Sequence, residues 1–176
     1  MPLIFTDEHS LRSGLMTRVM RRKKQILTKE RTEEILRNAT SGVLAVSGDD
    51  GYPYTVPLSY VYEDGKIYFH CAKEGHKIDS IRRNEKVSFC VVDKDQIVPE
   101  KFTTYFRSAI AFGKAKIVSE DSVKRHALEL LVKKYSPGFE VAGAEEIKKD
   151  FGTVCVVEIA VDYMSGKEAI ELVKGK

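Results

Sequence analysis

Residues 67–84 concentrate side chains that can bind an anion. A predicted strand ends there, a short loop containing Gly75 follows, and a helix is predicted from His76. The first turn of a helix presents unpaired backbone N–H groups and a partial positive charge, so it favours phosphate. Lys73, His76 and Lys77 surround that point. The pattern indicates a phosphate clamp, and the alternative is a solvated basic helix, because charge runs usually face water.

His70 ends the strand that precedes this loop. An imidazole can supply a proton to a substrate near neutral pH; the alternative role is a local hydrogen bond within the strand. Cys71 is adjacent along the strand and therefore points to the opposite face. The two cannot chelate one metal together, and no other Cys or His pair has zinc-site spacing. We expect no metal.

Pro57 lies inside a predicted strand, Tyr54–Tyr62. Proline has no backbone N–H, so it should interrupt strand pairing at its own position. The resulting gap in the ladder is a place where a planar ligand could meet backbone groups.

Six strands are predicted from apolar and β-branched patterning. They are Val43–Ser47, Tyr54–Tyr62, Lys66–Cys71, Val87–Asp93, Thr103–Val118 and Thr153–Asp162. Gly48–Gly51 and Asp64-Gly65 are typical hairpin turns, and Gly113 indicates a bulge within a long strand. Val87–Asp93 is nearly continuously apolar, which predicts that both of its faces are covered.

Four helices are predicted between these strands. The first runs from the N-cap Thr28 to about Asn38, and the second is His76–Asn84, with Ile78 and Ile81 facing the core. The third is capped by Ser119 and ended by Ser136-Pro137-Gly138, and the fourth is Ala144–Asp150. The third carries an apolar stripe of Val123, Ala127, Leu130 and Leu131. Strands joined mainly by hairpins, with helices between them, favour a closed or split antiparallel barrel over a parallel sheet.

The run VPLSYVYEDGKIYFHCAKEGHKIDSIRRNEKVSFCVV, Val56–Val92, closely resembles the 5-nitroimidazole antibiotic resistance family. That family belongs to the pyridoxamine 5'-phosphate oxidase-like flavin-binding split barrels. Pro99–Val118, Ser165–Leu172 and the MRRKKQI run at Met20 resemble the same family, so the resemblance covers nearly everything after residue 19. It implies a mainly β fold with flanking helices, a six-stranded antiparallel split β-barrel of the FMN-binding type. We assign residues 1–27 to an N-terminal extension and 28–176 to the flavin-binding split-barrel domain.

The resemblance also implies FMN, or alternatively FAD, bound at a homodimer interface. Main-chain groups along Thr55–Tyr60 would face the flavin ring, with Thr55 and Ser59 spaced to hydrogen-bond near its nitrogens. The His70–Lys77 region would hold the phosphate, and Thr103–Ser108 of the other subunit would close the site. The residues assigned to the cofactor are Thr55, Val56, Pro57, Leu58, Ser59, Tyr60, His70, Cys71, Ala72, His76, Lys77 and Ile81. His70 corresponds to the histidine that the family places beside the flavin and implicates in drug reduction.

These assignments predict a flavin-dependent oxidoreductase that reduces small electrophilic molecules such as nitroimidazoles. One alternative is an oxidase of pyridoxamine 5'-phosphate, which would need a second basic cluster near the site, and the sequence shows none. The other is a flavin-binding module for storage or sensing that is not an enzyme. The same cofactor contacts serve both an enzyme and such a module.

Composition bounds the remaining partners. The 176 residues carry a net charge of +3 and are 43% hydrophobic, as in an ordinary globular protein. No apolar run approaches the roughly 18 residues of a membrane span, and the N-terminus lacks the apolar stretch of a signal peptide, so we expect a cytoplasmic protein without a membrane partner. The apolar segments exceed what one small barrel covers, which favours a homodimer. Cys71, Cys90 and Cys155 are expected as free thiols.

Two further segments carry no function in this interpretation. The basic residues of Arg18–Lys24 have no interleaved aromatic side chains on which bases could stack, so we expect no nucleic-acid partner. Ser165-Gly166-Lys167 is similar to the end of a P-loop, but Glu168 stands where Ser or Thr is needed and the earlier glycine is absent.

Overall fold

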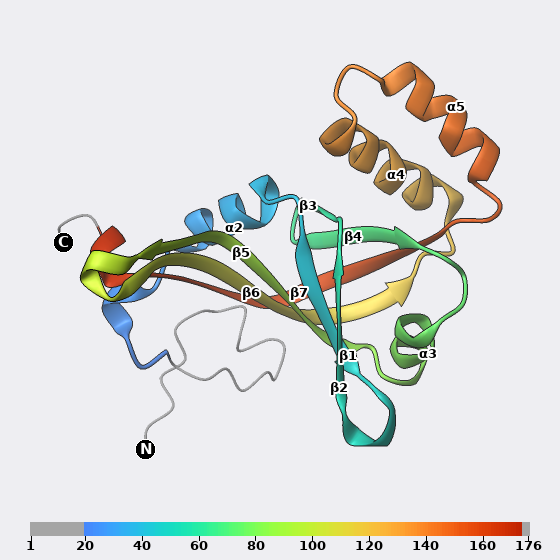
Figure 1. Ribbon diagram of the computed structural model, residues 1–176. Helices are drawn as coiled ribbons and strands as arrows, with labels where there is room; N and C mark the ends of the chain where they lie inside the picture. Colours follow the sequence, from blue (N-terminus) through green and yellow to red (C-terminus); the bar gives the residue numbers. More distant parts are fainter. Residues whose placement is uncertain (1–19, 174–176) are drawn as a thin grey trace.

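The structure is a computed structural model that describes residues 20–173, so residues 1–19 of the predicted N-terminal extension lie outside the described part. Its strands are β1 Gly42–Ser47, β2 Pro53–Leu58, β3 Val61–Glu63, β4 Lys66–Cys71, β5 Lys86–Val98, β6 Thr103–Ile117 and β7 Cys155–Glu168. Its α-helices are α2 Lys29–Asn38, α3 His76–Arg83, α4 Asp121–Tyr135 and α5 Glu140–Asp150. Strands β1 to β4 follow one another directly, α3 separates them from the β5–β6 hairpin, and α4 and α5 precede β7 (Figure 1).

The strands form one antiparallel sheet in the order β2-β1-β5-β6-β7-β4-β3. Strands β2 and β3 are therefore the two edges of the sheet, yet only Ser59 and Tyr60 separate them in the chain. The sheet must curl until its edges approach each other, which makes a barrel that is split at this point. The predicted fold class is confirmed. The predicted strand Tyr54–Tyr62 is divided at this corner, so the sheet has seven strands.

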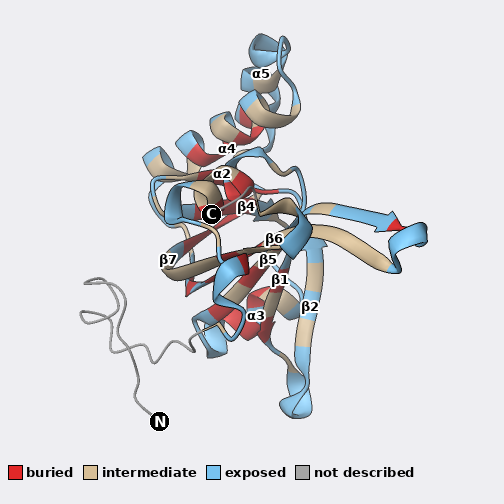
Figure 2. Ribbon diagram, turned by 90° about the vertical axis from the view of Figure 1, so that its left-hand side faces the viewer, coloured by how far each residue is buried: buried red, intermediate tan, exposed pale blue. Residues whose placement is uncertain are grey.

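The barrel interior forms the main core. Its largest fully buried side chains include Tyr60, Phe69 and Phe89, and the rings of Tyr60 and Phe89 pack edge to face. Figure 2 shows the buried residues gathered in the barrel, while the β1–β2 and β5–β6 hairpins extend into solvent. A second, smaller core joins the outside of β4 and β7 to helices α4 and α5. Figure 1 shows these two helices as a pair above β4, with α3 on the other side of that strand.

The turn predictions are confirmed. Asp64 and Gly65 have φ of 46° and 77° and connect β3 to β4. Gly113 lies at a register shift between β6 and β7. A Cβ atom at Gly113 would lie 2.2 Å from the carbonyl oxygen of Ala160, so this position cannot carry a side chain without moving the backbone.

The helix predictions hold except at some boundaries. The side chain of Thr28 caps α2 by accepting a hydrogen bond from the backbone N–H of Arg31. Ser119, however, is not a cap: α4 begins at Asp121 after Glu120, and no side chain caps it within the described chain. Helix α5 begins at Glu140, four residues before the predicted start. Among the described residues, no helix is long and apolar enough to cross a membrane.

The pairing of β2 differs from the prediction at Pro57. The ladder with β1 continues through the pair Val43 and Pro57 to the pair Gly42 and Leu58. Proline is tolerated because β2 is an edge strand, which can direct the position without an N–H away from its neighbour. The gap in pairing lies instead at Ser59 and Tyr60.

Strand β5 is covered on one face only by the described residues. Val87, Phe89 and Val91 face the core, whereas Val92 is 61% exposed and Cys90 is half-buried. The prediction that both faces are covered is therefore wrong for the single chain. The continuous apolar pattern reflects an outward face that is apolar yet accessible.

Candidate functional site

A pocket of about 980 Å³ lies between the end of β4 and the α4–α5 pair. From the barrel side it is lined by Ser59, His70, Cys71 and Ala72. From the helical side it is lined mainly by apolar residues together with Glu146 and Asp150. Four residues that the sequence assigns to the cofactor thus meet in one cavity. Ser59 comes from the corner between β2 and β3, and His70 comes from β4.

The start of α3 lies one short loop beyond His70. Its N-cap is Gly75, whose φ of 123° is unfavourable for any residue with a side chain, and no described side chain caps the helix. The Gly75 carbonyl accepts hydrogen bonds from the N–H groups of Ile78 and Asp79. The N–H groups of His76 and Lys77 precede these and have no partner within the helix, as at any helix start. They form the anion-binding end that the sequence predicts.

The three basic residues around this helix start have different partners. Lys73 Nζ donates to the carbonyl oxygen of Gly152, in the loop before β7. His76 stacks on Tyr54 with ring centroids 4.1 Å apart, and its Nε2 lies 3.5 Å from an oxygen of Asp49. The side chains of Lys73 and His76 therefore bind segments that neighbour the helix start.

Lys77 is different. It is half-buried, and among the described residues no carboxylate lies within ion-pair distance of its Nζ. A half-buried ammonium without a counter-ion beside an uncapped helix start is suited to an anionic ligand. The charge of Lys77 also acts on the neighbouring thiol of Cys71 by lowering its pKa, against the larger effect of burial, which raises it.

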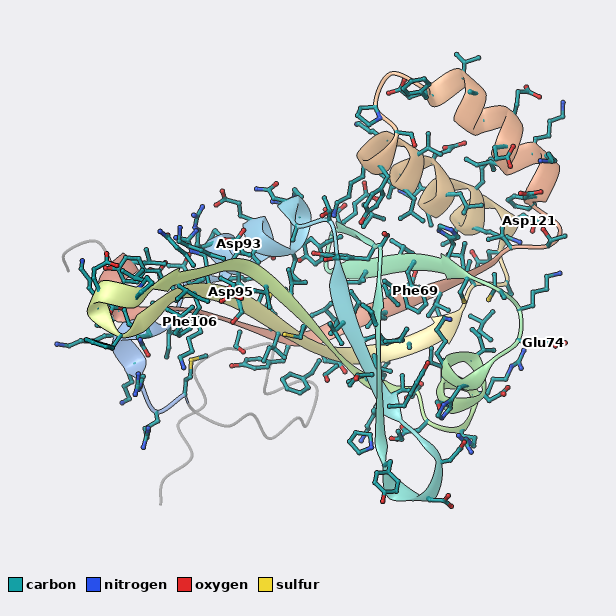
Figure 3. All side chains as sticks on the ribbon, viewed as in Figure 1. Phe69, Glu74, Asp93, Asp95, Phe106 and Asp121 are labelled. Atoms are coloured by element: carbon teal, nitrogen blue, oxygen red, sulfur yellow. The ribbon has the colours of Figure 1, made fainter. Side chains whose placement is uncertain are left out.

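His70 and Cys71 point to opposite faces of β4, as predicted. Cys71 packs against the barrel core with Phe69, which Figure 3 marks on β4, whereas His70 is exposed and lines the pocket. On the same face as His70, Tyr68 is buried against α4 and α5. His70 thus lies on the same face of β4 as the buried Tyr68, but its imidazole faces the pocket, where a ligand can reach it.

Tyr135, the last residue of α4, joins this helix to the split in the barrel. Its hydroxyl oxygen lies 2.9 Å from the amide nitrogen of Tyr60 and 2.7 Å from the Tyr60 carbonyl oxygen. Tyr135 also lines the pocket. Neither Tyr135 nor the side of the pocket formed by α4 and α5 is predictable from the sequence, because nothing in the pattern of these helices indicates which strand they cover.

The structure separates the other predicted cofactor residues. The side chains of Val56 and Leu58 pack partly buried against the barrel core, and those of Tyr60 and Ile81 are buried within it. Only their backbone could meet a ligand, and the Tyr60 backbone is already bonded to Tyr135. Thr55 and Pro57 are exposed on the outer face of β2 and do not line the pocket.

Thr55 and Pro57 belong to an uncharged outer face that crosses five strands. Residues in direct register form two rows. The first is Thr55, Ala45, Ser88, Phe112 and Tyr163, and the second is Pro57, Val43, Cys90, Ile110 and Ser165. None of the ten side chains is buried within the described structure. We name these ten residues the outer face.

The family can now be assigned. A profile of the family described as pyridoxamine 5'-phosphate oxidase matches residues 28–168, which span the barrel, the pocket and both helices above it. The chain belongs to the pyridoxamine 5'-phosphate oxidase family. No curated protein sequence matches it.

Solved structures of other proteins agree with this family. A protein of Bacteroides thetaiotaomicron, described as a candidate 5-nitroimidazole antibiotic resistance protein, is 27% identical with a TM-score of 0.66, covering 81% of this chain and 86% of that chain. An FAD-binding protein of Mesorhizobium loti is 26% identical with a TM-score of 0.59, covering 82% and 97%. A conserved protein of Mycobacterium tuberculosis is 19% identical with a TM-score of 0.76, covering 90% and 95%, and shows the likeness of fold alone.

Proposed function

We propose that this member of the pyridoxamine 5'-phosphate oxidase family is a homodimeric flavin-dependent oxidoreductase that reduces small electrophilic molecules such as nitroimidazoles. The observation that carries the proposal is that His70 and Ser59 line one pocket. The uncapped start of α3 and Lys77, which has no carboxylate partner among the described residues, follow His70 by a few residues along the chain and lie outside the lining of that pocket. One end of this arrangement suits a phosphate, and the other suits a planar body with a proton donor beside it.

The names of two similar proteins support the cofactor and the substrate class. The Mesorhizobium protein is described as FAD-binding, and the Bacteroides protein as a candidate for resistance to 5-nitroimidazole antibiotics. Both exceed 25% identity over more than four fifths of this chain. We favour FMN over FAD because the start of α3 and Lys77, which has no carboxylate partner among the described residues, account for one terminal phosphate.

Each residue has a separate task in this proposal. Lys77 and the first N–H groups of α3 hold the phosphate through charge-assisted hydrogen bonds. Ser59 and the free edge of β2 offer hydroxyl and backbone groups to the ring. A bound flavin supplies the electrons or hydride. His70 donates a proton to the substrate, and the apolar side chains of α4 and α5 keep water from the reacting end of the pocket.

The homodimer is supported by the outer face. A second copy seated there would cover Phe112, Ile110 and Val43, each at least 38% exposed in the single chain. Such an interface would also bring the partner against Thr55 and Pro57, the predicted ring contacts that the pocket of one chain leaves out. The β5–β6 hairpin, with Phe102 97% exposed at its tip, extends from the same strands (Figure 2).

The charge of the pocket weighs against oxidation of pyridoxamine 5'-phosphate. That substrate carries its own phosphate, yet the helical wall contributes Glu146 and Asp150. Two carboxylates would repel a second phosphate at close range. A flavin-binding module without enzymatic activity has no such conflict, and the test below distinguishes it.

The test is anaerobic spectroscopy of the purified full-length protein loaded with FMN. We expect the flavin absorbance to bleach on addition of a reduced nicotinamide or dithionite and to return when a nitroimidazole is added. The rate of return should exceed that of free reduced FMN at the same concentration. A protein that binds FMN but reoxidises no faster than the free cofactor would be a binding module, and one that does not bind flavin would overturn the proposal.

A further inference from the structure

Two cysteines face each other across neighbouring strands beside the pocket. Cys71 ends β4 and Cys155 begins β7, and the two are direct register partners at the last pair of this ladder. Directly opposed residues of antiparallel strands have Cα atoms about 4.5–5.5 Å apart. Disulfides span Cα separations of about 4.4–6.8 Å. The backbone therefore already holds the two residues at bonding distance.

The side chains are on the same side of the sheet. Cys155 is buried in the barrel core, and Cys71 is half-buried against that core. Burial, and next the neighbouring thiol of Cys155, raises the pKa of Cys71. Both cysteines are free thiols in this structure.

The two cysteines differ in exposure. Cys71 is half-buried and is one of the residues that line the pocket, with its side chain toward the barrel core, whereas Cys155 is buried. Cys90, the third cysteine, is on the outer face opposite Val43 and Ile110, with no cysteine as a register partner. Cys71 and Cys155 are therefore placed to form an intramolecular disulfide, and Cys90 is a separate thiol that serves as an internal control.

We propose that Cys71 and Cys155 are a redox-active pair that forms an intramolecular disulfide when a hydroperoxide enters the pocket. The Cys71 thiolate attacks the peroxide oxygen, breaks the O–O bond and becomes a sulfenic acid as one water is formed. The sulfur of Cys155 then attacks the sulfur of Cys71, the S–O bond breaks, and a second water leaves. Two thiols and one hydrogen peroxide thus give one disulfide and two waters.

The disulfide would join β4 and β7 covalently at the side of the pocket. The residues next to the pair, His70 and Ala72 on one strand and Val154 on the other, all line the pocket. Lys73 already links the same two segments through the Gly152 carbonyl. Oxidation would add a covalent link to this hydrogen bond, directly beside the proposed proton donor His70. The inference stands on strand register and does not depend on the identity of the cofactor.

The experiment uses the full-length Cys90→Ser protein treated with hydrogen peroxide, followed by intact mass, thiol counting after denaturation and non-reducing peptide mapping. We expect the loss of two hydrogen atoms, the loss of both thiols and a peptide that joins Cys71 to Cys155. Because burial holds Cys71 mostly protonated, the rate should rise about tenfold for each pH unit in neutral and mildly alkaline solution. Reductant should restore both thiols.

Two variants provide matched controls. Cys71→Ser/Cys90→Ser and Cys155→Ala/Cys90→Ser each retain one thiol of the pair, and neither should give the joined peptide. The inference would be overturned by thiols that persist in the folded protein at a peroxide dose that consumes them in the denatured protein. Oxidation of Cys71 to sulfinic acid without the joined peptide, or disulfides formed only between two chains, would overturn it equally.

Discussion

The hydroxyl of Tyr135 takes the place of a missing strand partner at Tyr60. It lies within hydrogen-bond distance of both the amide nitrogen and the carbonyl oxygen of Tyr60, at 2.9 and 2.7 Å. A hydroxyl has one proton to donate and can also accept. The Tyr135 hydroxyl accepts from the Tyr60 N–H, and its proton can be donated to the Tyr60 carbonyl oxygen or to the Thr40 carbonyl oxygen, which lies 2.6 Å away. Tyr60 lies where the chain passes from one edge of the sheet to the other. The end of α4 therefore supplies hydrogen bonds to the backbone at the point where the barrel is split.

Tyr135→Phe should therefore destabilise the protein. It leaves the polar backbone groups of Tyr60 without their partner, which costs about 1–3 kcal/mol in the free energy of unfolding. Urea denaturation measures this loss. Tyr105→Phe is the control, because the hydrogen-bond partner of its hydroxyl among the described residues is the exposed Lys101. Equal stability of the two variants would show that the Tyr135 contact contributes nothing to closure of the barrel.

Lys134 gives the stability a predictable pH dependence. Burial lowers the pKa of Lys134 to about 8, where its amine contacts the Ala39 carbonyl and the ring of Tyr60. An unfolded lysine titrates near about 10.4, so between these values the unfolded chain binds the additional proton. Stability conferred by this site must then rise with pH across that window and be constant below it.

The measurement is the difference in free energy of unfolding between the wild type and Lys134→Met at several pH values. We expect the difference to shift in favour of the wild type as pH rises from about 8 to about 10. Lys133→Met, at the exposed neighbouring position, is the matched control variant. A flat difference for Lys134→Met would contradict the lowered pKa.

His70→Gln should retain the flavin and slow the reduction of substrate. A missing general acid costs about 10²-fold or more in rate. Rates must be compared per bound flavin, because a variant that is only less stable loses cofactor and keeps its turnover. If rates per flavin match the wild type from about pH 5 to pH 8, His70 has no part in proton transfer.

Phe112→Asp should convert the proposed dimer to a monomer. Phe112 lies on β6 within the outer face, in register with Ser88 and Tyr163. A buried unpaired carboxylate is costly at an interface. Sedimentation at micromolar concentration measures the change. Val141→Asp, on exposed α5, should leave the mass unchanged. A wild-type monomer would remove the dimer from the account.

The barrel was largely predictable from the sequence because several of its turns and bends accept only a few residue types. Asp64-Gly65 requires positive φ, which few residues adopt, and Gly113 lies too close to the Ala160 carbonyl oxygen to carry a side chain. Each lies where the pattern indicates. The sequence could not show that Tyr54–Tyr62 turns a corner at Ser59. That break is set by closure of the sheet and by Tyr135, which is 75 residues further along the chain.

The site was predictable in part for the same reason. The helix start after Gly75 and the placement of His70 are local consequences of a strand, a loop and a helix in sequence. The roles of neighbouring cations were not. Lys73 and His76 appear equivalent to Lys77 in the sequence, but contacts with Gly152 and Asp49 engage the first two and leave Lys77 without a counter-ion among the described residues.

The central claim is that the start of α3 and Lys77 hold a flavin phosphate. Equilibrium titration of the apoprotein with FMN and with riboflavin, which lacks the phosphate, measures this directly in the wild type, in Lys77→Ala and in the control Arg82→Ala. A charge-assisted bond contributes about 1.5–3 kcal/mol, so FMN should bind the wild type about ten- to a hundredfold more tightly than riboflavin. This preference should largely disappear in Lys77→Ala and persist in Arg82→Ala. Equal affinity of the wild type for FMN and riboflavin, or an unchanged preference in a folded Lys77→Ala protein, would contradict the account.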